Sequence, residues 1–402
     1  MPSPPDDRPL AGVRVLELGQ LIAGPFAGCV LGYFGAEVIK VEPPGDGDAL
    51  RNWRELDDDG TSFWWRSMAR NKRCVTINLR EERGRELVHD LAMKSDVVLE
   101  NFRPGTMEKW GLGPERYREL RPQLVYTRVS GYGQSGPYSS RPGFASACEG
   151  FGGFRYINGF PDEAPVRPNL SMGDTLAAMN AIIGTLMALL GRARPGGAGQ
   201  VVDVAIYESV FNMLESVVPE FDGAGVVREP SGTTLTGIVP TNTYRCADGR
   251  HVVIGGNGDS IYKRLMQAAQ RPDLADDPRL TNNSGRVQHQ QEIDDAISAW
   301  TGQLKSDDVL AQLDAASVPN GPINSVREIM DDPHFQARGM FESVQVGKDT
   351  LKIPAMTPQL GTTPGRTEFA GPELGAHNDE VFRDLLGLTS TQIQQLNDAG
   401  VI

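Results

Sequence analysis

Short apolar segments alternate with helical patterns through the first 130 residues, and this alternation constrains the fold more than any other feature of the sequence. Strand-like runs separated by helix-length segments are typical of an α/β domain with a mainly parallel sheet. The sequence therefore predicts such a domain in the N-terminal part of the chain. The expected strands are 13–18, 37–42, 74–79, 97–100 and 124–129, and the expected helices are 81–94, 113–120 and one that runs through Tyr33.

The chain has 402 residues, which is long enough for two domains. The segment from about Val226 to Thr236 is rich in Gly, Ser and Thr and is typical of a linker or mobile loop. A hairpin pattern follows from Tyr244 to Ile254, and amphipathic helical patterns then continue to about Arg338. We therefore expect a linker and a second, smaller domain at 226–338.

Charge and composition exclude several classes of function. The net charge is −13, which argues against nucleic acid as a partner, because binding phosphates needs a basic face. The four cysteines contain no C-x-x-C pair and the five histidines contain no H-E-x-x-H spacing, so neither a disulfide framework nor a metal site is expected. The acidic, proline-rich segment 1–7 lacks the pattern of a signal peptide. We expect a cytoplasmic protein.

The longest apolar stretch runs from Leu176 to Leu190 and is interrupted by Asn180, Gly184 and Thr185. It is short for a bilayer span, which needs about 20 apolar residues. The sequence therefore predicts a buried helix and no membrane partner.

The turn Gly19–Pro25 lies between the first predicted strand and helix. The start of a helix offers free N–H groups and a favourable dipole to an anion, so this turn is one candidate nucleotide or phosphate site. The alternative is a plain turn in which Pro25 occupies the first helical position. The dinucleotide fingerprint G-x-G-x-x-G is absent here.

Two groups of cations lie beside predicted strands. Residues 71–73 and Arg80 flank one strand, and Arg103 and Lys109 follow another. Ligands of open α/β sheets bind at the carboxyl ends of the strands, and Arg suits a forked contact with phosphate. We expect these cations at strand ends, where they would serve a phosphorylated ligand. The alternative is solvated surface charge.

Asp174 is the candidate nucleophile. An apolar helical pattern begins immediately after it, which predicts the carboxylate at or next to a helix N-cap. Capping alone explains an aspartate at such a position. The other interpretation is a nucleophilic carboxylate, which the helix start would keep ionised and which Gly173 would leave open to a thioester carbonyl.

In combination, motifs along nearly the whole chain resemble the class III CoA-transferases, the group that contains formyl-CoA transferase. Each motif alone is weak, but their order and spacing are specific. They are Leu10-Ala-Gly-Val-Arg-Val-Leu-Glu, Ala23-Gly-Pro, Gly35-Ala-Glu-Val-Ile-Lys-Val-Glu, Asn71-Lys-Arg, Glu100-Asn-Phe-Arg-Pro-Gly, Ser130-Gly-Tyr-Gly-Gln-Ser-Gly-Pro-Tyr, Arg141-Pro-Gly-Phe, Gly173-Asp, Gly199-Gln-Val-Val-Asp-Val-Ala and Leu374-Gly-x-His.

The resemblance implies an α/β architecture with a Rossmann-like large domain built from residues 1–225 and 339–402. It implies a small α+β domain inserted between them, after a linker, in 226–338. It also implies an interlocked homodimer. By similarity, Asp174 attacks an acyl-CoA and becomes an aspartyl-CoA thioester, from which a second carboxylic acid takes the CoA. Coenzyme A esters are then substrates, and no permanently bound cofactor is implied.

The resemblance also implies contacts to CoA at four places. It places them in the first turn, after the third strand, after the Glu-Asn-Phe motif and at the start of the Gly-rich run. The matching positions are Ile22, Ala23, Ile77, Asn78, Leu79, Arg80, Asn101, Phe102, Arg103, Lys109, Val129, Ser130, Gly131 and Tyr132.

The sequence departs from formyl-CoA transferase at three positions that bear on specificity. A run of glycines is replaced by 231–237, Ile22 is apolar where that enzyme has a polar residue, and Glu149 stands where a glutamine is familiar. These departures argue against formate and oxalate as the acids that this protein uses as substrates. Arginines 141, 155 and 167 lie near Asp174 in sequence and would pair with a distal carboxylate of the substrate. This favours a dicarboxylic acid such as succinate as the donor. The alternative is that they are surface arginines in a loop-rich region.

Two other enzyme classes remain as alternatives. The α-methylacyl-CoA racemases share the fold but use a His-Asp pair in a Gly-His-Asp context, whereas this chain reads Gly143-Phe-Ala-Ser and has no histidine between His89 and His251. An NAD-dependent dehydrogenase would share only the α/β alternation, since the glycine fingerprint is missing.

Overall fold

The computed structural model describes residues 6–402. The chain divides into two compact units. The first unit contains the described residues up to Phe154, Pro168–Leu214 and Gln336–Ile402, and the second contains Arg155–Arg167 and Glu215–Phe335.

A six-stranded sheet forms the centre of the first unit. Every pair of neighbouring strands is parallel, and the order across the sheet is β3-β2-β1-β4-β5-β6. The parallel α/β sheet predicted from the alternation of strands and helices is thereby confirmed. The strands are β1 Arg14–Glu17, β2 Glu37–Glu42, β3 Lys72–Thr76, β4 Val97–Glu100, β5 Val125–Ser130 and β6 Val201–Ala205.

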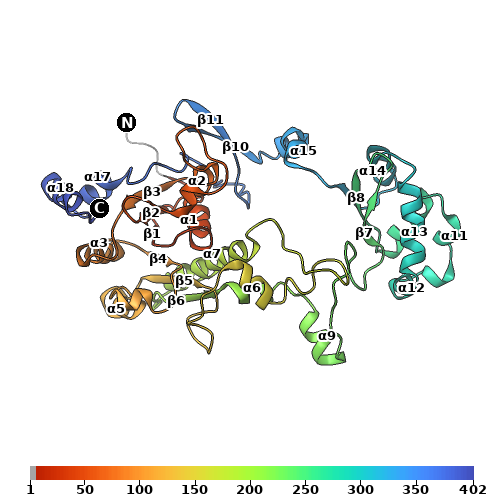
Figure 1. Ribbon diagram of the computed structural model, residues 1–402, viewed down its shortest axis with the longest axis horizontal. Coiled ribbons are helices and arrows are strands. Elements are labelled where there is room, and N and C mark those ends of the chain that lie inside the picture. The colour runs from red at the N-terminus through yellow and green to blue at the C-terminus, as the bar shows by residue number, and fades with distance from the viewer. Residues whose placement is uncertain (1–5) are drawn as a thin grey trace. The chain divides into compact units, whose positions relative to one another are not determined.

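Alternate side chains of the strands enter two separate cores, one on each face of the sheet. In β1, Val15 packs with residues of α1 and α7, whereas Leu16 packs with residues of α3 and α18. Helices therefore cover both faces (Figure 1). The helices of this unit up to residue 214 are α1 Ala23–Tyr33, the 3-10 turn Ala49–Asn52, α2 Phe63–Met68, α3 Glu82–Met93, α4 Thr106–Lys109, α5 Pro114–Leu120, α6 Ala145–Phe151, α7 Met172–Arg192 and α8 Ile206–Phe211.

Helix α7 is only partly buried, which corrects the prediction of a buried helix over Leu176–Leu190. Its small residues face the sheet, and Thr185 Oγ1 lies 2.7 Å from Thr127 Oγ1 of β5. On the opposite face, Met187 and Leu190 are 65% and 68% exposed. By length and composition alone α7 would suffice to cross a membrane, and one of its faces packs against β5 and β6.

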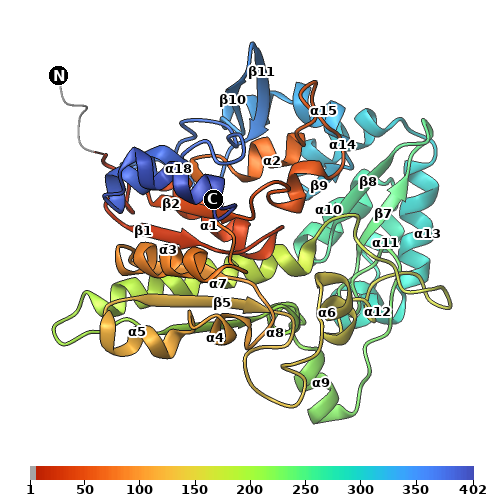
Figure 2. The same cartoon turned by 60° about the vertical axis from the view of Figure 1, so that its left-hand side comes forward.

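The C-terminal segment completes the outer edge of the sheet. Strand β3 lies at that edge, and the side chain of Asn378 accepts a hydrogen bond from Thr76 N at 2.8 Å. Beyond β3, Asn78 N donates to Val401 O at 2.7 Å. Figure 2 shows α18 beside the first strands of this unit. The elements of this segment are β10 Phe341–Val346, β11 Asp349–Pro354, α17 Asn378–Glu380, a π-helical turn Val381–Leu385 and α18 Ser390–Asp398, and α16 Pro333–Ala337 leads into it.

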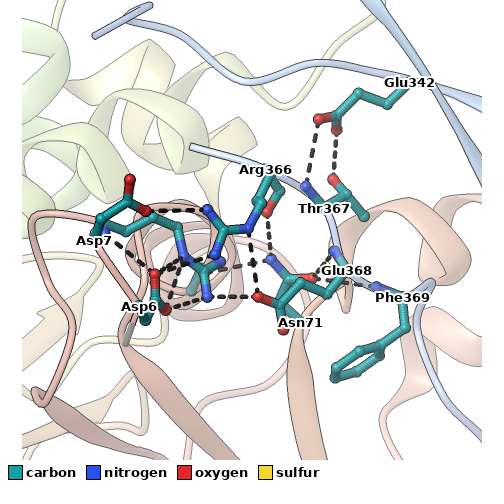
Figure 3. A network of polar contacts seen from close by, with 10 residues as sticks. Asp6, Asp7, Asn71, Glu342, Arg366, Thr367, Glu368 and Phe369 are labelled. Carbon is teal, nitrogen blue, oxygen red and sulfur yellow. Dashed lines mark hydrogen bonds and ion pairs between the residues drawn. The ribbon is translucent and has the colours of Figure 1, made fainter. Parts of the chain in front are cut away.

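The antiparallel hairpin β10–β11 was not expected from the sequence, in which prolines follow Met340. A polar network near it ties the N-terminal segment to the C-terminal segment (Figure 3). Arg366 contacts Asp6 and Asp7 at 3.3 and 3.4 Å, and Asn71 Oδ1 accepts a hydrogen bond from Glu368 N at 2.7 Å. The N-terminal segment, the start of β3 and the C-terminal segment are thus held in one place.

The second unit has its own hydrophobic core and a three-stranded antiparallel sheet of order β7-β8-β9. The hairpin expected near Tyr244–Ile254 is confirmed as β7 paired with β8. The elements are α9 Val217–Ala224, β7 Thr241–Arg245, β8 His251–Gly255, α10 Asp259–Ala268, α11 Pro272–Ala275, the 3-10 turn Pro278–Leu280, α12 Asn283–Gln288, α13 Gln290–Thr301, α14 Ser306–Ala315, β9 Asn320–Pro322 and α15 Val326–Asp331.

Candidate active site

Asp174 lies in the first turn of α7 and is half-buried. The helix begins at Met172 and its N-cap is Ser171, so Asp174 is the third helical residue and not the cap, which corrects the expectation from the sequence. A carboxylate in the first turn still lies in the favourable field of the unpaired N–H groups. The first turn of α7 is therefore a position that suits a carboxylate.

The start of α7 is packed tightly at Gly173. A Cβ atom there would lie 3.1 Å from Ile206 Cγ2 and 3.3 Å from both Ala145 Cβ and Glu149 Cγ. The glycine thus allows the close approach of α6 and the start of α8. The sequence suggested that Gly173 leaves room for a substrate, but the structure fills that space with protein.

Glu149 is a neighbour of Asp174 that sequence reasoning left unexplained. It lies in α6, is fully buried, and its Oε1 accepts a hydrogen bond from Gly173 N at 3.1 Å. It thereby satisfies one of the N–H groups that the first turn of a helix leaves without an intrahelical partner. The sequence showed only that a glutamate stands where a glutamine is familiar. Its burial and its partner become visible only in the structure.

Cys148 links this region to the loop after β5. Its Sγ donates to Gly131 O at 3.3 Å. Burial, together with the negative charges of Asp174 and Glu149, raises the pKa of the thiol to about 11. The thiol is therefore neutral at pH 7, acts as a donor that holds Gly131, and does not compete as a nucleophile.

The residues expected to contact CoA all lie at or after the carboxyl ends of parallel strands, so the sheet brings them to one edge. Three of the four groups follow the adjacent strands β1, β4 and β5. The group at 77–80 follows the edge strand β3, two strands from β1 and therefore about 10 Å away. Ligands of open parallel sheets bind at this edge, where the strand order reverses between β1 and β4.

Exposure divides the expected CoA contacts into two kinds. Ile22, Ala23, Ile77 and Val129 are at most 5% exposed as whole residues, so they offer a ligand little surface. The remaining side chains are half-buried or exposed except that of Ser130, which is 6% exposed. The exposed cations are Arg80, Arg103 and Lys109.

The cations at 71–73 do not belong to this edge, which corrects a prediction. Strand β3 begins at Lys72, two residues before the expected start, so these residues lie at its amino end. Lys72 is fully buried and its Nζ lies 2.9 Å from Glu17 Oε2. It is therefore unavailable to a phosphate.

Two buried polar atoms flank the loop after β5. Among the described residues, Ser130 Oγ and Gln134 Nε2 have no hydrogen-bond partner. Buried polar groups are ordinarily paired, so these two donors are candidates for contacts with a bound ligand. Gln134 was not among the residues expected from the sequence.

Comparison with known proteins gives one consistent family. The model of the family described as CoA-transferase family III matches residues 10–378. The chain is 48% identical over 398 residues to the succinyl-CoA–D-citramalate CoA-transferase of Chloroflexus aurantiacus, covering 98% of each chain. It is 39% identical to the alpha subunit of the succinyl-CoA–L-malate CoA-transferase of the same organism, covering 98% of this chain and 92% of that one. The crystal structure of a CaiB/BaiF family protein from Brucella suis superposes with a TM-score of 0.83 at 32% identity, covering 94% and 99% of the two chains.

Proposed function

The chain belongs to CoA-transferase family III, and from this membership we propose that the Asp174 carboxylate carries CoA between two acids. The activity of a CoA-transferase follows from the family; the identity of the nucleophile is the proposal. The observation that carries it is the position of Asp174, half-buried in the first turn of α7 and directly after the buried contact between Glu149 and Gly173.

The proposed reaction has four balanced steps. The Asp174 carboxylate attacks the donor thioester, forms a mixed anhydride and releases CoA thiolate. The thiolate attacks the aspartyl carbonyl, which gives an aspartyl-CoA thioester and the free donor acid. The acceptor carboxylate then attacks this thioester, forms a second anhydride and releases the thiolate. Finally the thiolate attacks the acceptor carbonyl, which yields the new acyl-CoA and restores the Asp174 carboxylate.

The surroundings of Asp174 fit this chemistry in two ways. Each step develops an oxyanion, and N–H or O–H donors beside the nucleophile would stabilise it. We propose the unpaired Ser130 hydroxyl and the backbone at Gly131 for this role. Burial of Glu149 and Cys148 on the adjoining side limits access of water, which would hydrolyse the anhydride and the thioester.

For the substrates we propose succinyl-CoA as donor and a 2-hydroxy dicarboxylic acid as acceptor. Two similar relatives are named for succinyl-CoA, and citramalate and malate, the acceptors in their names, are both acids of this class. Arg141, whose guanidinium lies 3.6 Å from the ring centroid of Tyr138, is the candidate for pairing with a distal carboxylate. Arg155 and Arg167 belong to the second unit.

Several expectations about architecture remain part of the proposal. The strand order, with its reversal between β1 and β4, supports the Rossmann-like description. A large domain of 1–225 and 339–402, with a linker and inserted domain at 226–338, follows from the family resemblance. The interlocked homodimer and the cytoplasmic location also rest on that resemblance and on the sequence.

The test is to trap the covalent intermediate. The protein is incubated with succinyl-CoA, quenched with hydroxylamine, digested and analysed by mass spectrometry. A hydroxamate on Asp174 is the expected result, and D174N and D174A should lose transfer activity by about 1,000-fold or more. D90N, which changes an exposed aspartate of α3, is the matched control. Full activity in D174A, or a hydroxamate elsewhere, would refute the assignment.

A further inference from the structure

A network of four buried charges lies beneath the turn that follows β1. Glu17, Lys40, Asp48 and Lys72 are all 0% exposed. Lys40 Nζ lies 2.9 Å from Asp48 Oδ2 and 3.2 Å from Glu17 Oε1, and Lys72 Nζ lies 2.9 Å from Glu17 Oε2. Two positive and two negative charges therefore balance. Burying four charges carries a large desolvation cost, which suggests that the network has a role beyond packing.

The network holds the backbone of the turn 19–22 directly. Lys40 Nζ donates to Gly19 O at 2.7 Å, and both carboxylate oxygens of Asp48 accept from Leu21 N at 3.1 Å. Between these two contacts, the side chain of Asn101 accepts from Gln20 N and donates to Gln20 O, each at 2.8 Å. Three successive residues of the turn are thus fixed by side chains.

The turn also contains a strained residue. Leu21 has a φ angle of 66°, in the left-handed region that a leucine rarely occupies. Such conformations persist only where the surrounding contacts impose them, and they gather at binding and catalytic sites. The hydrogen bonds that Leu21 N donates to the Asp48 carboxylate supply that constraint.

We propose that Lys40 and Asp48 are positioning residues for CoA, acting through the turn 19–22. The inference rests on the proposed function and on the CoA contacts that the family resemblance implies at Ile22 and Ala23. Both side chains are fully buried, so neither touches the ligand itself. They determine where the backbone amides of the turn lie at the carboxyl edge of the sheet.

The decisive variant removes both charges together. K40M/D48L leaves the Glu17–Lys72 pair intact and neutral, so no unpaired charge is buried. Either single variant would instead leave one buried charge without a balancing partner. We expect the KM for acyl-CoA to rise by about 10-fold while kcat changes by less than about 3-fold. K40M/D48N keeps an acceptor for Leu21 N, and its KM should rise by only about 3-fold.

The matched control is R70M/E342Q, which removes another pair of a buried arginine and its glutamate in the same unit. It should lower the melting temperature and leave the KM unchanged. An unchanged KM in folded K40M/D48L overturns the proposal. If that variant does not fold, an unchanged KM in K40M/D48N overturns it instead.

Trapping at Asp174 separates this proposal from the proposed function. If wild-type protein and the variants all form the Asp174 hydroxamate and the KM does not move, only the positioning role fails. If the wild-type protein forms no adduct at Asp174, the nucleophile assignment fails, whatever the KM values are.

Discussion

The Oε1 atom of Glu149 accepts a hydrogen bond from the backbone N–H of Gly173 at 3.1 Å, one residue before Asp174. The contact is buried and joins α6 to the first turn of α7. It therefore fixes the part of the backbone that carries the proposed nucleophile.

Removal of this contact is expected to slow the transfer reaction. E149A leaves Gly173 N buried without its acceptor, at a cost of about 1–3 kcal/mol, and loosens the start of α7. We expect kcat to fall about 10- to 100-fold, because small misplacements of a reacting group are costly. E149Q keeps an acceptor oxygen and should lose much less. Steady-state kinetics and thermal melts check this; equal kcat values for E149A and wild type would contradict it.

Substitution of Gly173 should have a similar effect for a steric reason. A Cβ at this position would lie 3.1 to 3.3 Å from atoms of three neighbouring side chains, so in G173A we expect these neighbours or the helix start to move by a few tenths of an ångström. We expect kcat to drop by about 10-fold. The control is G150A in α6, where a Cβ would have no neighbour within 4 Å. Similar kcat values for the two variants would show that the tight packing is irrelevant to activity.

Substitution of Gly28 should strongly destabilise the first unit. A Cβ at Gly28 would lie 1.8 Å from Glu17 Oε2, which is held by Lys72 within the buried charge network. G28A therefore forces apart a buried ion pair, and we expect a loss of at least about 3 kcal/mol of unfolding free energy. G191A, at the end of α7, meets no atom within 4 Å and should be neutral or slightly stabilising. Denaturant titration of both variants measures the difference.

The protein should lose stability in mild acid through His377. Its Nδ1 accepts a hydrogen bond from Cys74 N at 3.2 Å, which requires that nitrogen to be unprotonated. Burial lowers the pKa of His377 below its usual 6.5, so the unfolded chain takes up the proton first. The stability is then complete above pH 6.5 and decreases as the pH falls below it.

The measurement is the melting temperature between about pH 7.5 and pH 5.5. H377N removes the titrating ring while keeping an amide oxygen, and its melting temperature should depend less on pH than that of the wild type. H334N removes an exposed histidine and should behave as the wild type does. Parallel curves for the wild type and H377N would rule out this role.

The sequence was informative where local pattern decides the structure. The strands at 37–42 and 97–100 and the helix at 82–93 lie within a residue or so of their predicted positions, because alternate burial on two faces leaves a readable pattern. The strand at 72–76 was displaced in the prediction, because it begins with a lysine. Nothing local reveals that Lys72 is paired with Glu17 inside the core.

The parts that sequence reasoning missed all depend on contacts between distant segments. The contact of Glu149 with Gly173, the bonds from Asp48 to Leu21 and the exposed face at Met187 follow from how helices and loops are packed, which the pattern of apolar residues does not record. Asp174 itself could be singled out only because the surrounding motifs resemble a known family.

The attachment of the C-terminal segment to the edge of β3 has a consequence for biosynthesis. Thr76 N donates to the side chain of Asn378, which lies 302 residues further along the chain, and Asn78 N donates to Val401 O. Until those residues are synthesised, the N–H groups of Thr76 and Asn78 lack these acceptors in the nascent chain. The sheet edge at β3 is therefore completed by residues that are synthesised long after β3 itself, and until then it is an open strand edge of the kind that favours aggregation.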